Sequence, residues 1–109
     1  MGLATATIAN AEDYRQVLSS SRPVFLLFVS ARCPACSQAV PLFERVAANY
    51  PEVVSMVLDC ENTPRHPEVK GTPTWLIYLN GELKEAFKGL GAPEDQDQFV
   101  EDTFARYAR

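Results

Sequence analysis

The sequence predicts a single α/β domain, covering residues 1–109, in which helices flank both faces of a mixed sheet of four or five strands. A continuous apolar run of strand length, "PVFLLFV", and a second, mostly apolar segment of strand length, "VVSMVLD", are separated by one long amphipathic segment. A third apolar run, "TWLIYL", is joined to "ELKEAFKG" by Asn-Gly, a strong hairpin signal. Strands that alternate with helical segments in this way are typical of a sheet covered by helices.

The composition is that of an ordinary globular protein, with 47% hydrophobic and 22% charged residues. A formal net charge of −4 and a pI of about 4.9 argue against a nucleic-acid or anionic-membrane partner. No apolar run approaches the roughly 20 residues that span a bilayer, and the N-terminus lacks the basic and apolar regions of an export signal. We therefore expect a cytoplasmic monomer that binds neither membranes nor nucleic acids.

The N-terminal part is predicted to hold one helix and the first central strand. The segment Asn10–Ser19 begins with a capping residue and continues with apolar residues at helical spacing. The run Pro23–Val29 is apolar at every position, which is typical of a strand buried on both faces. That double burial is the reason to expect helices on both sides of the sheet. A short strand from Ala4 to Ile8 would be the fifth of the sheet.

The next segment is predicted to be the longest helix. Apolar residues recur at i, i+3 and i+4 spacing from Cys36 to Tyr50. Pro41 lies inside this pattern and should kink the helix, and Pro51 should end it. The second apolar strand, Val53–Asp59, follows. Because a helix separates the two apolar strands, we expect them to run parallel.

The C-terminal half is predicted to contain a hairpin and a final helix. Thr74–Leu79 and Glu82–Gly89 would be its antiparallel strands, joined at Asn80–Gly81. The segment Pro93–Ala108 carries acidic residues early and arginine late, as the helix dipole favours. The predicted element order is therefore α-β-α-β-β-β-α.

Two cysteines separated by Pro-Ala stand where the first apolar strand gives way to the helix. Their three-residue spacing in a first helical turn allows the sulfurs to form a disulfide. Cys33 would face the free N–H groups of the helix N-terminus, and Arg32 adds positive charge, so the pKa of its thiol should fall below the ordinary value of about 8.5. Cys36 lies on the apolar stripe and should remain a thiol. Disulfide exchange requires this combination: Cys33 attacks a substrate disulfide and Cys36 resolves the mixed disulfide.

From about Asn10 to the C-terminus, the sequence resembles the thioredoxin-fold family in three places. "CPAC" stands in the position of the family's active-site motif, and Pro41 matches the proline of the active-site helix. "KGTPTWLIYLNGE" is similar to the segment that bears the family's cis-proline, and "KGLGA" to the segment that bears the substrate-groove glycine. A lone C-x-x-C is weak evidence, but its combination with Thr-Pro before a third strand and Asn-Gly after it is specific.

The resemblance implies a thiol-disulfide oxidoreductase whose catalytic residues are Cys33 and Cys36 and which acts on protein disulfides, with reduction as the expected direction. Its redox-active disulfide would need no bound cofactor or metal, and a thiol system such as thioredoxin reductase or glutathione would supply electrons. Pro73 would be cis, and Thr72 would offer backbone groups to an extended substrate peptide. The residues implied in substrate binding are Arg32, Pro34, Thr72, Pro73 and Gly89.

The sequence also departs from the thioredoxin pattern. Arg32 replaces the tryptophan that usually precedes the first cysteine, and Pro-Ala replaces Gly-Pro. Leu27 stands where these proteins carry a buried aspartate that relays the second cysteine's proton, and Ser55 stands where they carry a buried lysine. Proline directly after the first cysteine is more similar to glutaredoxins and some oxidising members. The proton relay is therefore absent, and the direction of electron flow is open.

Alternatives remain for each cysteine and for the single histidine. Cys33 and Cys36 could be two small residues packed at a helix start. A zinc site needs four ligands, and only Cys60 and His66 remain, both in one loop. We expect Cys60 to be a partly buried thiol at a strand end, with a secondary redox or dimer-forming role as the alternative. We expect His66 to be a solvated loop residue.

Two other functions also fit the sequence. A thioredoxin-like binding or adaptor module with little redox activity would explain the missing proton relay. An exported disulfide oxidase or isomerase would explain the proline after Cys33. Replacing both cysteines with serine separates the adaptor from the oxidoreductase, because only the adaptor would keep its function.

Overall fold

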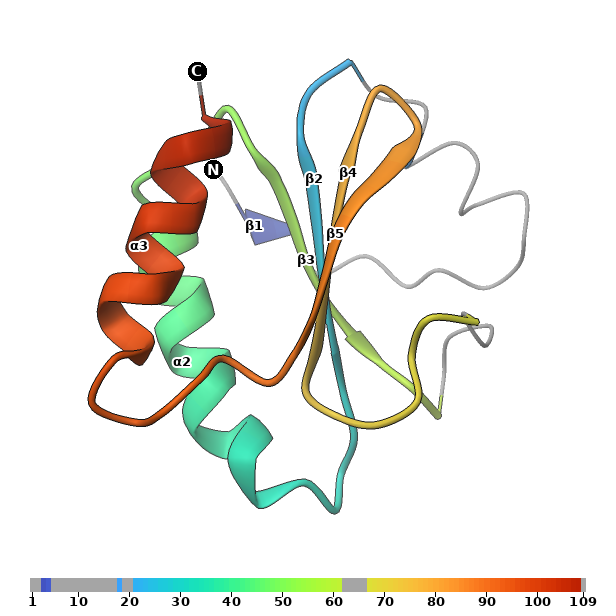
Figure 1. Cartoon of the computed structure of the whole chain (residues 1–109), viewed down its shortest axis with the longest axis vertical. Helices are drawn as coiled ribbons and strands as arrows, with labels where there is room; N and C mark the ends of the chain where they lie inside the picture. The colour runs from blue at the N-terminus through green and yellow to red at the C-terminus, as the bar shows by residue number, and fades with distance from the viewer. Residues whose placement is uncertain (1–2, 5–17, 19–20, 62–66, 109) are drawn as a thin grey trace.

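The computed structural model describes residues 3–4, 18, 21–61 and 67–108. Within these residues the strands form one sheet in the spatial order β1-β3-β2-β4-β5, with the very short β1 at one edge (Figure 1). The elements are β1 (Leu3–Ala4), β2 (Val24–Val29), α2 (Pro34–Ala47), β3 (Val54–Asp59), β4 (Thr74–Leu79), β5 (Glu82–Lys88) and α3 (Gln96–Tyr107).

The sheet is mixed, as the sequence predicts. β2 pairs in parallel with β3 and antiparallel with β4, and β4 pairs antiparallel with β5. The β4–β5 hairpin turns at Asn80 and Gly81, which have φ angles of 54° and 81°. Two consecutive positive φ angles are the geometry that Asn-Gly favours, since asparagine tolerates the left-handed region and glycine adopts it without steric cost. The predicted hairpin is confirmed.

α2 ends earlier, and α3 begins later, than the sequence predicts. α2 ends at Ala47, three residues before Tyr50, and the amides of Asn49 and Tyr50 close tight turns onto the carbonyls of Val46 and Ala47. Because a residue that precedes a proline avoids the helical region, α2 could not continue through Tyr50 into Pro51. α3 begins at Gln96 rather than at position 93, because residues 92–95 form a turn closed by an amide-to-carbonyl bond of 2.9 Å.

Side chains of β2 are buried on both faces of the sheet. Phe25 and Leu27 join a cluster that includes residues of α2 and α3, whereas Leu26 and Phe28 join a second cluster on the opposite face. All four side chains are at most 1% exposed. The continuous apolar pattern therefore identifies a strand buried on both faces, as predicted.

Both helices that the structure describes pack against the same face of the sheet (Figure 1). Of the helix predicted over Asn10–Ser19, only Leu18 is described, and it packs against the second cluster. The rest of that segment, and residues 5–8 of the predicted fifth strand, lie outside the described residues. Helices on both faces thus stay a prediction, and so does the kink at Pro41, which lies inside α2. No helix of the described ranges is long and apolar enough to cross a membrane.

Trp75 of β4 lies at the centre of an aromatic cluster. Its side chain is fully buried, and its indole N–H has no hydrogen-bond partner among the described residues. Aromatic rings packed at such distances prefer tilted or edge-to-face geometry. The surrounding rings, with centroids 5.3 to 5.8 Å from that of Trp75, are those of Phe25, Phe43, Phe87, Phe99 and Phe104.

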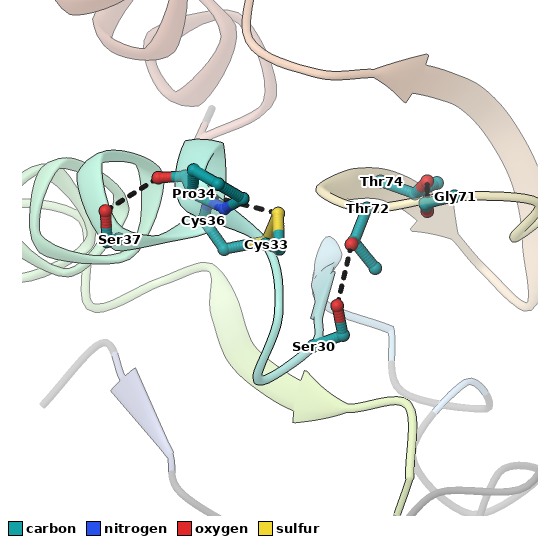
Figure 2. The surroundings of a disulfide bond; sticks show 8 residues. All are labelled: Ser30, Cys33, Pro34, Cys36, Ser37, Gly71, Thr72 and Thr74. Carbon is teal, nitrogen blue, oxygen red and sulfur yellow. Dashed lines mark hydrogen bonds between the residues drawn. A yellow bond between two sulfur atoms is a disulfide. The ribbon is translucent and has the colours of Figure 1, made fainter.

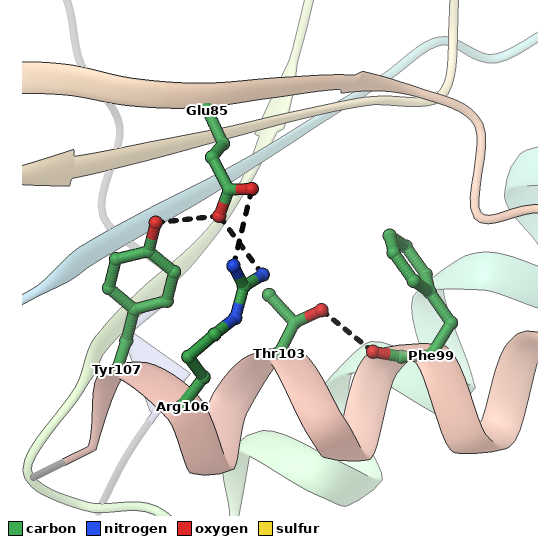
Figure 3. Close-up of polar contacts among 5 residues, drawn as sticks. All are labelled: Glu85, Phe99, Thr103, Arg106 and Tyr107. Carbon is green, nitrogen blue, oxygen red and sulfur yellow. Dashed lines mark hydrogen bonds and ion pairs between the residues drawn. The ribbon is translucent and has the colours of Figure 1, made fainter.

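The last turn of α3 is joined to β5 by a polar cluster (Figure 3). The Tyr107 hydroxyl donates to Glu85 Oε2 at 2.6 Å, and Arg106 Nη2 lies 3.0 Å from the same oxygen. Burial and the hydrogen bond to Glu85 raise the pKa of Tyr107 to about 12, from an ordinary value of 10.0. The folded state therefore favours the neutral phenol of Tyr107 over its phenolate.

We expect Tyr107→Phe to lower the free energy of unfolding by about 1 kcal/mol at pH 8, the usual value of one hydrogen bond. Because the pKa is raised on folding, the stabilisation is fully present below pH 10 and is lost as the pH rises to about 12. Urea unfolding of both proteins between pH 8 and pH 12 measures the difference. If the difference in unfolding free energy between the two proteins stayed constant from pH 8 to pH 12, the stabilising hydrogen bond assigned to Tyr107 would be contradicted.

Candidate active site

The two cysteines occupy the junction between β2 and α2. Cys33 is the N-cap of α2, with extended backbone angles, and Pro34 begins the helix. The amide of Cys36 donates to Cys33 Sγ at 3.1 Å. Proline suits a first helical position because the N–H that it lacks would have no partner within the helix. The sequence thus places the first sulfur against an N–H group at the positive end of the helix dipole.

Cys33 and Cys36 form a disulfide, with Cα atoms 5.2 Å apart. The two residues differ in access to solvent: Cys36 is only 4% exposed, whereas Cys33 is half-buried. This difference confirms the predicted asymmetry, in which the first cysteine is accessible and the second lies on the buried stripe of α2. The arrangement allows an external disulfide to reach Cys33 before Cys36.

A loop before β4 faces Cys33 (Figure 2). The Thr72–Pro73 peptide bond is cis, and Thr72 Oγ1 lies 3.0 Å from Ser30 Oγ in the segment that leads to Cys33. The hydroxyl of Thr74 donates to the Gly71 carbonyl at 2.6 Å, which closes the loop. Side-chain hydrogen bonds therefore tie the loop both to itself and to the cysteine segment.

Gly89, which directly follows β5, contacts the opposite side of this loop. The Gly89 amide donates to the Pro73 carbonyl at 2.8 Å, and Gly89 has a φ angle of 80°. A side chain at this position would be strained, because residues with a Cβ atom rarely adopt that angle. Glycine is therefore the residue that lets the chain turn here while its amide reaches the loop.

These segments enclose a surface cavity of about 380 Å³, here called the cis-proline groove. Of the residues implied in substrate binding, Thr72, Pro73 and Gly89 line it, together with Ala35 from between the cysteines. Arg32 and Pro34 are exposed beside Cys33 but do not line the groove. The complete lining is Ala35, Lys70, Gly71, Thr72, Pro73, Thr74, Lys88 and Gly89.

Three residues in this region were not predicted from the sequence. Ser30 bonds to the loop, and Lys70 and Lys88 line the groove. Each lysine directly precedes a glycine, in "KGTP" and "KGLG", the segments that carry the family resemblance. That repeated Lys-Gly pair was a signal for the two lysines, whereas nothing local distinguishes Ser30.

The positions of the missing proton relay are apolar or uncharged. Leu27 is fully buried and is paired with Val57 on one side and Trp75 on the other. Ser55 is also fully buried, and its hydroxyl has no hydrogen-bond partner among the described residues. Neither Leu27 nor Ser55 therefore supplies an ionisable side chain that could relay a proton.

Cys60 follows β3 as a free, partly buried thiol, as the sequence analysis expects. Burial raises the pKa of this thiol, and the neighbouring Asp59 carboxylate raises it further, so Cys60 is a weak nucleophile at neutral pH. His66 lies outside the described residues. Within the described part of the chain no three His, Cys, Asp or Glu residues are grouped as a metal site.

Comparisons with known proteins agree with this geometry. The thioredoxin family model matches residues 5–102. Thioredoxin H5 of rice is 28% identical over 87 residues, which are 77% of this chain and 64% of the rice protein. Thioredoxin of Chlamydia trachomatis is 26% identical over 96 residues, which are 85% of this chain and 90% of that protein.

Solved structures show the same fold. The thioredoxin of Malassezia sympodialis superposes with a TM-score of 0.80 at 15% identity, covering 97% of this chain and 92% of that one. A structure from work on thiol resolution in yeast mitochondrial 1-Cys peroxiredoxin via glutathione/thioredoxin systems gives a TM-score of 0.75 at 19% identity, covering 91% and 95%. With the matched family model and the Cys33–Cys36 pair, these findings show that the chain belongs to the thioredoxin family of thiol-disulfide oxidoreductases.

Proposed function

We propose that this protein reduces disulfides in other proteins and becomes oxidised to the Cys33–Cys36 disulfide as it does so. The observation that carries the proposal is the half-buried Cys33 at the N-cap of α2, bonded to buried Cys36 and facing the Thr72–Pro73 loop. The amide that donates to Cys33 Sγ would stabilise a thiolate at that sulfur after reduction. Family membership supports the same reaction class.

The reaction would proceed in two exchanges. The Cys33 thiolate attacks one sulfur of the substrate disulfide, a new bond forms between them, and the other substrate sulfur leaves as a thiolate that takes up a proton. Cys36 then loses its proton and attacks Cys33 Sγ, which releases the second substrate thiol and forms the intramolecular disulfide. Two electrons pass to the substrate. Because Leu27 is apolar, water rather than a carboxylate would accept the proton of Cys36.

The substrate would dock beside Cys33, in the cis-proline groove. Thr72, Pro73 and Gly89 line this groove, and Arg32 and Pro34 flank the nucleophile. Backbone groups of Thr72 would pair with an extended peptide, as strand addition does at other exposed edges. A thiol reductant such as thioredoxin reductase or glutathione would regenerate the dithiol, with no further cofactor. We propose the cytoplasm as the compartment, where thiols are kept reduced.

The first test uses the Cys60→Ser protein, which retains only the active-site pair. Its reduction potential is measured by equilibration with mixtures of reduced and oxidised glutathione. We expect a potential more negative than about −220 mV, which favours transfer of electrons to protein disulfides in the cytosol. A potential near −120 mV would overturn the reductase direction in favour of an oxidase, because the dithiol would then be the more stable form.

The second test assigns the two cysteines. In the Cys60→Ser background, we expect Cys33→Ser to reduce turnover of a protein disulfide to the uncatalysed background. Cys36→Ser should accumulate a mixed disulfide with the substrate, because the first exchange proceeds and the second cannot. Mass spectrometry under non-reducing conditions detects that adduct. If both variants still act like the parent protein, the catalytic assignment is wrong and a binding module is the better account.

A further inference from the structure

The cis-proline groove is lined by two cationic side chains and no acidic one. Lys88 is the last residue of β5 and pairs with Thr74 at the start of β4, so the strand register places it beside the loop. Lys70 belongs to the segment that leads into the same loop. Ala35, which lies between the two cysteines, forms the wall nearest the reactive sulfurs. A ligand that fills the groove therefore contacts both the cysteine segment and the lysines.

Positive charge in this groove contrasts with the rest of the molecule. The formal net charge of the chain is −4, yet both ionisable residues that line the groove are lysines, and both are exposed. Arg32, which is also exposed, adds a third positive charge directly before Cys33. A cleft that carries one sign of charge concentrates ligands of the opposite sign.

None of the ion pairs among the described residues includes a lysine of the groove. These pairs join Arg45 to Asp97, Lys84 to Glu82 and Arg106 to Glu85. Glu85 lies on the same strand as Lys88 but on the opposite face of the sheet, where it bonds to α3. Glu68 is exposed two residues before Lys70 and does not line the groove.

We propose that the cis-proline groove selects disulfide substrates whose reacting cysteine has a carboxylate side chain within about two residues. The inference rests on the proposed reductase function and names its substrate class: acidic segments of other proteins. In an extended peptide, residues i and i+2 are about 7 Å apart and point their side chains to the same side. A glutamate two residues from the reacting cysteine would therefore enter the groove on the same side as that cysteine. Lys70 and Lys88 are specificity-determining residues, whereas Cys33 and Cys36 carry the chemistry.

The experiment measures the rate at which fully reduced Cys60→Ser protein reduces three symmetric peptide disulfides. The peptides are identical except that the residues two before and two after the cysteine are Glu, Gln or Lys. Each second-order rate constant is divided by that of dithiothreitol with the same peptide, which removes the effect of the charges on the leaving thiol. We expect a normalised preference of about tenfold for the Glu over the Lys peptide at low ionic strength, decreasing toward unity in 0.5 M salt.

Three variants with the same change of net charge locate the effect. Lys70→Glu and Lys88→Glu should each lose most of the preference for the Glu peptide over the Lys peptide. Lys84→Glu is the matched control, because Lys84 lies on β5 outside the groove and is paired with Glu82, and it should keep the preference. The Gln peptide also shows whether a variant is folded and retains its catalytic pair.

The outcomes separate this inference from the function on which it rests. If the parent protein reduces none of the peptides faster than a free thiol of similar pKa, the reductase function fails. If it reduces all three at equal normalised rates, or if Lys84→Glu changes the preference as much as the groove variants do, only the charge selection fails. Oxidised glutathione is assayed beside the peptides as a further substrate. If the protein preferred oxidised glutathione but not the Glu peptide, the assignment to acidic protein segments would also be overturned.

Discussion

Replacing Trp75 with alanine is expected to lower the free energy of unfolding by about 3–5 kcal/mol, the usual cost of removing a large aromatic side chain from a core. Trp75 is fully buried against rings that come from β2, α2, β5 and α3, so the cavity would open at the point where both helices meet the sheet. Domains are stable by only about 5–15 kcal/mol, so this one change removes a large part of the total. Urea unfolding with tryptophan-independent circular dichroism measures it.

Trp75→Phe is the matched control. It keeps an aromatic ring and also removes the buried indole N–H that lacks a partner among the described residues. An unpaired buried donor costs about 1–3 kcal/mol, so its removal offsets part of the lost packing. We expect the phenylalanine variant to lose less than about 2 kcal/mol. If the alanine variant lost no more than the phenylalanine variant, Trp75 would not be the centre of the core.

Leu27→Asp is expected to destabilise the protein by an amount that grows with pH. Leu27 is fully buried between Val57 and Trp75, so a carboxylate there would lose its hydration without gaining a charged partner in the register. Burial of this kind raises the pKa of a carboxyl group by up to about 3–5 units. Thioredoxins carry an aspartate at the matching position, so the substitution also tests how far this chain has adapted to its absence.

The sign follows from the proton count of the two states. Below about pH 4 the new carboxyl group is neutral in both the folded and the unfolded chain. Between that pH and the raised folded value, only the unfolded chain ionises, so stability falls by about 1.4 kcal/mol for each pH unit. A rise of three units therefore predicts a loss of about 4 kcal/mol between pH 4 and pH 7. Urea midpoints at pH 4.5, 6 and 7.5 measure it.

Leu27→Asn is the control for this second prediction. Its side chain is of similar size and polarity but does not ionise, so its cost should be the same at each pH. An aspartate variant that matched the asparagine variant at pH 7.5 would show that the site is hydrated or holds a counter-charge. That outcome would contradict the apolar surroundings inferred for Leu27.

Much of the fold follows from local patterns in the sequence. The apolar run of β2, the mostly apolar segments of β3 and β4, and the Asn80–Gly81 turn were all predicted, because burial on two faces and positive φ angles each require particular residue types. The predicted ends of the helices were less accurate. The apolar spacing continues to Tyr50, but the residue before a proline leaves the helical region, and α2 ends at Ala47.

The sequence by itself predicted where the two cysteines of the site lie. Two cysteines three residues apart at a strand-to-helix junction predict an N-cap sulfur and a partner on the apolar stripe of the helix, because helix geometry sets the position of each side chain on the helix. Only the tertiary structure decided what surrounds them. The pairing of β4 with β5 places Lys88 against the loop that follows Lys70, and the bond between Ser30 and Thr72 holds that loop beside the cysteine segment. Contacts between residues so distant in sequence depend on strand register, which no local pattern encodes.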